Sequence, residues 1–183
     1  MDKQKIGFFS LYDTETPGSY VGALLVTDNY GLPLEFKCTH SVKPTAIQKS
    51  LYGDKLKPYI AVTLCGIPLL NSISNRPNLL FINIPFILGI RPQIEIPTLL
   101  IRRAGEAINL QSDDRVETEK ERIENESGQY QAIVIQSHPD YKEDAKAHTA
   151  TNNQLFNNFD LIEPFDRMKK SIEILGKNDR KFQ

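Results

Sequence analysis

Two carboxylates stand one residue apart, at Asp13 and Glu15, directly after an apolar and aromatic run that begins at Ile6. Side chains at positions i and i+2 of a strand point to the same side of a sheet. Two carboxylates on one side can share a divalent cation, and two-metal hydrolysis of phosphodiesters needs such pairs. The pair therefore indicates a candidate Mg²⁺ or Mn²⁺ site. The alternative for the same segment is a polar turn that the Asp and Thr side chains cap.

The segment 13–16, Asp-Thr-Glu-Thr, resembles the first motif of the DEDD-type 3′–5′ exonucleases. In that family the motif ends the first strand of an RNase H-like sheet. The strands expected over residues 21–27 and 34–39 also follow where the family has its second and third strands. The resemblance implies a metal-dependent nuclease or phosphodiesterase in which Asp13 and Glu15 are ligands and Asp160 is a third carboxylate.

The later motifs depart from that family. The second motif would be an Asn followed by Phe-Asp, and Asn83 offers the frame, but Ile87 occupies the position of the aspartate. The last motif would be a His with an Asp about five residues later. His138 has its aspartate after two residues, and His148 has none nearby. A motif without its structural partners is a weak indicator of function.

Zinc binding, nucleophilic catalysis and nucleotide binding by a phosphate loop have less support in the sequence. Cys38 and His40 share one face of an expected strand, and Cys65 could approach them, but a structural zinc site needs four ligands that usually come as close-spaced pairs. A buried thiol and an edge-strand imidazole are the prediction. The sequence contains neither a GxSxG nucleophile elbow nor a glycine-rich phosphate loop. We therefore expect no cofactor outside the Mg²⁺ or Mn²⁺ of the nuclease alternative.

Tyr52 and Tyr59 are the candidate interaction residues. They lie in and beside the expected junction of two helices, where Leu51, Tyr52 and Gly53 follow one another. If these side chains are exposed, they would suit a protein partner. If they are buried, they belong to the core.

The elements that position these residues follow from hydrophobic periodicity. The residues 6–39 predict a β-meander, and Pro44 opens a run of helices in which Gly66 and Pro68 should kink or break the second helix. Further strands are expected at 79–83, 97–101 and 130–135, and an amphipathic helix that Asp160 caps runs to Gly176. The fold class is thus α/β (or α+β): an N-terminal β-meander followed by helices, a mixed sheet of five to six strands and a C-terminal amphipathic helix. Residues 1–183 form one domain, with a charged flexible loop at about 112–128.

The composition limits the classes of partner that the protein is expected to bind. The formal net charge is −1, so the whole chain has no excess of positive charge for nucleic acid. Contact with nucleic acid would then need a local patch or a partner protein. No apolar run approaches the ~20 residues of a membrane span, and the N-terminal residues do not form a secretory signal. These features predict a cytoplasmic protein without membrane contact.

Several segments, among them 21–28, 31–36, 51–53 and 159–167, resemble a group of small hypothetical bacterial proteins. The resemblance implies a bacterial origin, one compact α/β unit and a binding or scaffolding role. We therefore expect a non-catalytic interaction subunit of a bacterial multiprotein system, in a context such as defence against phage or foreign DNA. The alternative is the metal-dependent nuclease that uses Asp13 and Glu15. A third hypothesis is a nucleotide-binding or small-molecule module with its cleft at the strand ends.

Overall fold

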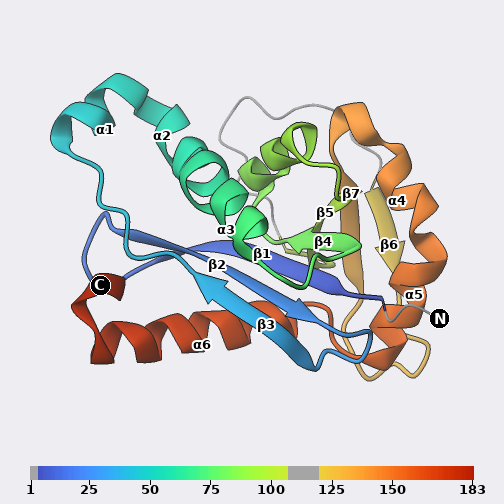
Figure 1. The fold of residues 1–183 in the computed structure, drawn as a ribbon. Helices are drawn as coiled ribbons and strands as arrows, with labels where there is room; N and C mark the ends of the chain where they lie inside the picture. The colour runs from blue at the N-terminus through green and yellow to red at the C-terminus, as the bar shows by residue number, and fades with distance from the viewer. Residues whose placement is uncertain (1–3, 107–119) are drawn as a thin grey trace.

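A computed structural model describes residues 4–106 and 120–183, which form one mixed sheet with helices on both faces (Figure 1). The sheet has seven strands in the order β3-β2-β1-β4-β5-β7-β6. The strands are β1 (Ile6–Asp13), β2 (Tyr20–Thr27), β3 (Pro33–Cys38), β4 (Leu79–Ile82), β5 (Thr98–Arg103), β6 (Lys120–Ile123) and β7 (Ile133–Ser137). The α/β class is confirmed, with seven strands where five to six were expected.

The first three strands form the expected antiparallel meander. β1 pairs with β2 over its whole length, from Ile6 opposite Thr27 to Asp13 opposite Tyr20. Asp28 closes the next turn, because its carboxylate accepts hydrogen bonds from the backbone N–H groups of Tyr30 and Leu32. β3 then lies at the edge of the sheet, and its more exposed side chains fit the alternating pattern of an edge strand.

The other half of the sheet is built around parallel strands. β4 lies parallel to β1 and β5 lies parallel to β4. All four residues of β4 are buried, as expected for a strand that is covered on both faces. β7 and β6 follow as antiparallel strands at the far edge. Of the charged loop expected at about 112–128, the residues up to 119 lie outside the described residues, whereas Lys120–Ile123 forms β6.

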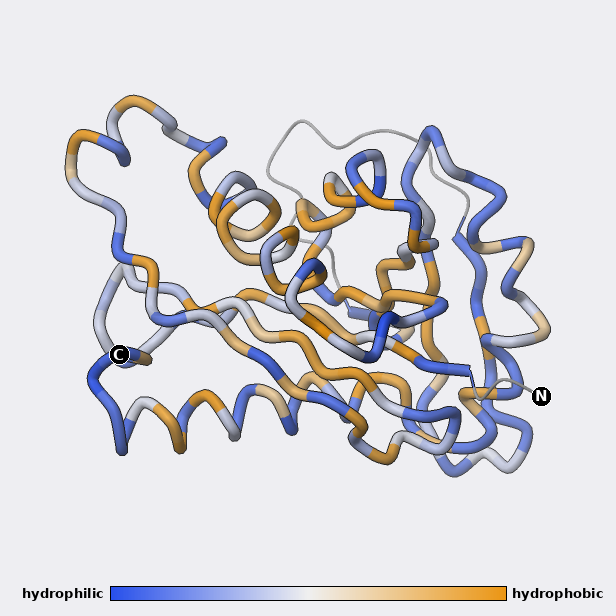
Figure 2. The backbone as a smooth tube through the Cα atoms, viewed as in Figure 1, coloured by the Kyte–Doolittle hydropathy of each residue, from blue (hydrophilic) through white to orange (hydrophobic). Residues whose placement is uncertain are grey.

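Helices cover the two faces of the sheet. One face is covered by α1 (Ala46–Tyr52), η1 (Gly53–Lys55), α2 (Leu56–Tyr59), η2 (Ile60–Gly66), α3 (Ile67–Ser72) and η3 (Pro85–Gln93). The remaining helical segments of the described residues are η4 (Pro139–Tyr141), α4 (Glu143–Ala147), α5 (Thr149–Asn158), α6 (Glu163–Asn178) and η5 (Arg180–Phe182). Figure 2 shows the apolar central strands between these layers and the polar residues of α6 along its outer side. Within the described ranges, none of the helices combines the length and the apolar character that a bilayer crossing requires.

In the second expected helix, where Gly66 and Pro68 were expected to cause a kink or break, α2, η2 and α3 follow one another without a break. The middle segment, η2, is a wide π-helix, and Pro68 sits at the start of α3. A π-helical segment adds residues to a turn and so absorbs a local mismatch inside a longer helix. Gly66 has the small size that this position needs, because a Cβ atom there would lie 2.7 Å from Ile90 Cδ1.

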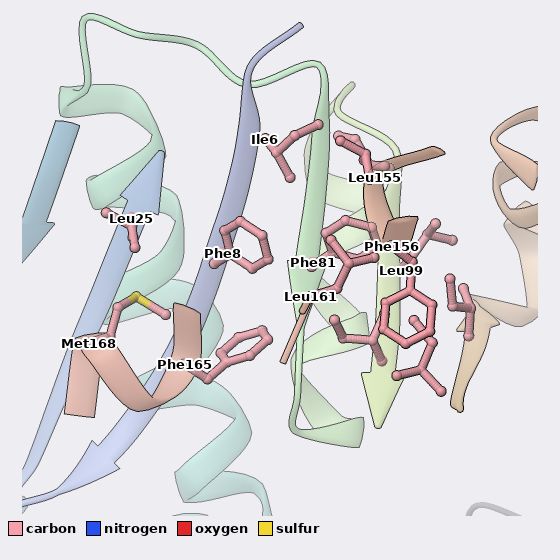
Figure 3. Packing of buried hydrophobic residues seen from close by; sticks show 14 of the residues in the cluster. Ile6, Phe8, Leu25, Phe81, Leu99, Leu155, Phe156, Leu161, Phe165 and Met168 are labelled. Atoms are coloured by element: carbon pink, nitrogen blue, oxygen red, sulfur yellow. The ribbon is translucent and has the colours of Figure 1, made fainter. Parts of the chain in front are cut away.

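The core has two parts, one on each face of the sheet. On the α6 side, Phe8 packs against Phe81 and Phe165 with ring centroids 5.7 Å apart in both pairs (Figure 3). On the other side, apolar residues of η2, α3 and η3 cover Phe9, Leu24 and their neighbours. Because successive residues of β1 point to opposite faces, this strand contributes to both parts of the core.

Candidate active site at the tip of strand β1

The carboxyl end of β1 projects beyond its parallel neighbour. β1 stays paired with β2 up to Asp13, but its ladder to β4 ends at Phe9 opposite Ile82. The chain leaves β1 toward β2 on one side, while β4 lies on the other side, so the strand order reverses here. Open α/β sheets bind ligands outside the carboxyl ends of the strands at such a switch point.

A pocket of about 260 Å³ opens beside this projecting end, and we call it the tip pocket. One wall is the segment 12–15, which contains both Asp13 and Glu15. The opposite wall comes from α6 and the residues after it: Lys169, Ile172, Glu173, Gly176, Lys177, Phe182 and Gln183. Residues Asp13 and Glu15 therefore line one pocket together with Glu173 and two lysines, while the Asp13 carboxylate itself is turned toward Lys57 of α2.

Asp13 and Glu15 belong to different local structures. Asp13 is the last residue of β1, whereas Glu15 lies in the turn between β1 and β2. That turn is closed by hydrogen bonds from the Thr14 N–H to the Ser19 carbonyl and from the Ser19 N–H to the Thr16 carbonyl. The Thr14 hydroxyl also accepts a hydrogen bond from the Thr16 N–H, as expected for a capped polar turn.

A lysine from the helical layer neutralises part of the charge at this tip. Lys57 Nζ lies 3.6 Å from Asp13 Oδ1 and 5.0 Å from the centroid of the Tyr20 ring. The Asp13 side chain is 72% exposed, so water screens this ion pair strongly. Asp13 therefore remains available to a cation or a ligand in solution.

Asp160 lies apart from the two other carboxylates. It forms an ion pair with Arg103 at the end of β5, and its carboxylate accepts a hydrogen bond from the Ile162 N–H just before α6. It does not line the tip pocket. Among residues 4–106 and 120–183, no three His, Cys, Asp or Glu side chains lie close enough together to hold a metal ion.

Uncharged hydroxyl and amide groups form the hydrogen bonds near the ends of β1 and β4. The Ser10 hydroxyl donates a hydrogen bond of 2.6 Å to Asn83 Oδ1, and the Tyr12 hydroxyl donates one to the Phe165 carbonyl. Burial raises the pKa of the Tyr12 phenol above its ordinary value because the phenolate would lose its hydration. Ile87, at the aspartate position of the exonuclease motif, is fully buried in the core beneath the helices. This part of the site therefore carries no charge that could bind a cation.

The cysteines and His40 are separated by their packing. Cys65 is buried in η2 beneath β2, and its Sγ lies 3.9 Å from the Thr39 hydroxyl. Burial raises the pKa of both the Cys65 and the Cys38 thiols. The His40 ring packs edge-on against Phe182, with centroids 5.5 Å apart.

Tyr52 and Tyr59 lie on the helices that project from the sheet at upper left in Figure 1. Their ring centroids are 5.0 Å apart, and the ring planes are inclined by 38°. The two residues are 39% and 36% exposed, so they belong to the surface and not to the core.

Lys57, Lys169, Lys177 and Glu173 were not found by sequence reasoning. They reach the tip from α2 and α6, and only the packing of those helices against β1 and β2 makes them neighbours of Asp13. No local sequence pattern indicates these residues, because only the tertiary fold brings them close to Asp13.

Comparisons with known proteins identify the fold. No family model and no curated protein matches the chain. Among solved structures, a variant of endonuclease V from Ciona intestinalis, in complex with a 23-mer DNA containing an inosine followed by a ribo-adenosine, is similar with a TM-score of 0.50 and 12% identity. A second structure of that protein, with a 24-mer DNA, is similar with a TM-score of 0.49 and 13% identity. Each likeness covers 80% of this chain and 76% of the other.

This likeness corrects the functional expectation drawn from the sequence. A non-catalytic interaction subunit was expected because the motifs were incomplete and the charge was balanced. That expectation is wrong, because the fold is shared with a nuclease that is seen bound to DNA.

Proposed function

We propose that the chain is a metal-dependent nuclease or related phosphodiesterase, with Asp13 and Glu15 as metal ligands in the tip pocket. The observation that carries the proposal is that residues Asp13 and Glu15 both line one pocket at the carboxyl end of β1. The sheet around that strand has a fold similar to endonuclease V, which supports nucleic acid as the substrate.

The donor set fits a cation that is shared with the substrate. Mg²⁺ keeps several waters and is usually bound through one or two carboxylates together with substrate phosphates. Asp13 and Glu15 supply such hard oxygen ligands, and the described part of the chain does not complete an all-protein cage around them. When bound, the cation would polarise a phosphoryl oxygen and lower the pKa of a water molecule.

The lysines of the pocket supply the charge that a phosphate needs. Lys169 and Lys177 line the wall opposite Asp13, and Lys57 lies beside Asp13 itself. These three ammonium groups stand near the carboxylates of Asp13, Glu15 and Glu173. Such a mixture of charges favours a ligand that combines an anionic phosphate with a cation. The exposed Lys57 can exchange its partner Asp13 for a phosphate oxygen, because a screened surface ion pair holds it only weakly.

The test is cleavage of labelled DNA and RNA, single- and double-stranded, with Mg²⁺ or Mn²⁺. We expect cation-dependent cleavage by the wild type and a loss of roughly 100-fold or more in rate for Asp13→Asn and for Glu15→Gln, since each removes a charged ligand. Calorimetric titration with Mn²⁺ should show weaker binding to both variants.

Glu126→Gln is the matched control. Glu126 is an exposed glutamate that lies between β6 and β7, outside the tip pocket, and its substitution should leave the cleavage rate unchanged. Absence of cation-dependent cleavage of all four substrates by the wild type would contradict the proposal. So would an Asp13→Asn variant that cleaves at the wild-type rate.

A further inference from the structure

Residues 43–59 form an exposed arm, which contains α1, η1 and α2 and projects from the sheet (Figure 1). None of the residues of α1, η1 or α2 is buried, so the arm contributes little to the core. Large apolar side chains stay exposed on it, with Ile47 at 71% and Leu51 at 77%. Exposed apolar groups that gather in one place are typical of a binding surface.

The charge of the arm contrasts with that of the whole chain. It contains four lysines, Lys43, Lys49, Lys55 and Lys57, against the single acid Asp54, and all five are exposed. The net charge of the arm is therefore +3, whereas the chain as a whole carries −1. A local positive patch of this kind complements a phosphate backbone.

The arm also presents aromatic rings. Tyr52 and Tyr59 contact each other with centroids 5.0 Å apart, and each remains more than a third exposed. Because the two rings pack against one another, each is held in position without being buried. Aromatic rings among basic side chains form stacking surfaces for unpaired bases, since the bases of a duplex are already stacked on each other.

The arm contacts the segment that forms one wall of the tip pocket. Lys57 pairs with Asp13 at 3.6 Å, and the Lys49 ammonium packs against Gly18 in the turn that also contains Glu15. A nucleic acid strand on the arm would therefore lie next to Asp13 and the β1–β2 turn.

We propose that the arm binds single-stranded nucleic acid, with bases stacked on Tyr52 and Tyr59 and phosphates at Lys49 and Lys55. The inference rests on the proposed function only in taking the tip pocket as the place where that strand is cut. It assigns a substrate class, unpaired strands in preference to duplexes, that the carboxylates alone do not indicate.

The test is fluorescence anisotropy with a labelled 20-nucleotide single strand and the matching duplex, in EDTA so that no cleavage occurs. We expect the wild type to bind the single strand more tightly than the duplex. A Tyr52→Ala/Tyr59→Ala double variant should bind the single strand about 10-fold more weakly or worse, because each stacked base contributes substantially to affinity. A Tyr52→Phe/Tyr59→Phe variant should bind as the wild type does, since the rings are retained.

The lysines have a separate readout. A Lys49→Gln/Lys55→Gln variant should lower the slope of log affinity against log salt by about 1.4, since each lost phosphate contact on a single strand changes it by about 0.7. Tyr30→Ala is the control for the aromatic pair, because Tyr30 is 63% exposed and lies in the turn between β2 and β3. It should bind like the wild type.

The results separate the two proposals. Equal affinity of the wild type and the double alanine variant, or equal affinity for single strand and duplex, would overturn the binding role of the arm. Glu126→Gln, which lies outside both the arm and the tip pocket, should bind the single strand in EDTA as the wild type does. Tight binding that depends on the tyrosines, without any cation-dependent cleavage, would support the arm and overturn the nuclease.

Discussion

Glu35 on β3 fixes the loop that precedes β4. Its carboxylate accepts hydrogen bonds from the backbone N–H groups of Ser74 and Asn75 and from the Asn75 side-chain amide. These hydrogen bonds, first of all the one from the Asn75 N–H, lower the pKa of Glu35 below its ordinary value, and Lys37 at 3.6 Å acts in the same direction. A lowered pKa in the folded state means that the charged carboxylate stabilises the fold.

The sign of the pH dependence follows from this shift. The stabilisation by Glu35 is fully present above the pKa of the unfolded chain and is lost as the pH falls from there through the lowered folded-state pKa. We expect Glu35→Gln to reduce the urea midpoint at pH 7 and to change it much less at pH 3. Urea titrations of both proteins at the two pH values check this. An equal difference in urea midpoint at pH 7 and pH 3 would show that the effect comes from the shape of the Glu35 side chain and not from its charge.

At this scale, the candidate site was only partly predictable from the sequence. Asp13 and Glu15 could be found because two carboxylates at i and i+2 after an apolar strand are a local pattern. Asp160, the expected third carboxylate, pairs with Arg103 and does not line the tip pocket. The residues that do line the pocket with them, such as Glu173 and Lys169, are placed by the docking of α6, which a local pattern does not record.

Among the elements, β2 and the π-helix η2 approach closely at one glycine. A Cβ atom on Gly22 would lie 2.4 Å from Cys65 Cβ, well inside any normal contact. The φ angle of Gly22 is not in the left-handed region, so its absent side chain, and not its backbone, is what this position requires.

We expect Gly22→Ala to destabilise the fold by about 1–3 kcal/mol, because the helix must move away from the sheet or strain the strand. Gly89→Ala is the matched control, since open space surrounds Gly89 and its φ is negative or extended. It should be close to neutral. Chemical unfolding of both variants measures the difference, and equal midpoints would show that η2 gives way without cost.

The elements differed in how strongly the sequence predicted them. The meander has apolar runs separated by turn residues, and α6 has a clear period of 3.6 residues, and both were predicted. α5 was missed, because Thr149–Asn158 is rich in Thr and Asn and buries only Asn152, Leu155 and Phe156. β6 was taken for part of a charged loop, because three of its four residues are charged and one, Ile123, is buried. Tertiary contacts decided both cases.

For the molecule as a whole, one buried ion pair joins distant segments. Arg91 of η3 forms two hydrogen bonds to Asp144 of α4, at 2.5 and 3.1 Å, and also lies 4.1 Å from the centroid of the Tyr141 ring. The two charged side chains are only 12% and 11% exposed. The pair ties the helical layer after β4 to the helices after β7.

We expect Asp144→Asn to destabilise the protein by about 3 kcal/mol, because it leaves the guanidinium of Arg91 buried without its counter-charge. Glu95→Gln is the control, since it removes an exposed ion pair with Arg76 and should change little. Thermal and urea unfolding measure both. A small, equal effect of the two substitutions would show that water reaches Arg91 easily.

The strand order was not predictable from the sequence, because the sequence pattern records which residues are buried but not which strand lies beside which. The apolar run of β4 indicates a central strand, yet its parallel pairing with both β1 and β5 is set by the helical connections.

The alternation of side-chain direction along β1 limits the insertions and deletions that this strand can accept. Tyr12 and Asp13 are neighbours, and their side chains lie on opposite faces of the sheet. An insertion or deletion of one residue within β1 would exchange those faces, moving the carboxylate inward and the phenol outward. A change of length in the turn from Thr14 to Ser19 leaves these faces unchanged. Variation in length within β1 is therefore more disruptive to the sheet than variation in the turn that follows it.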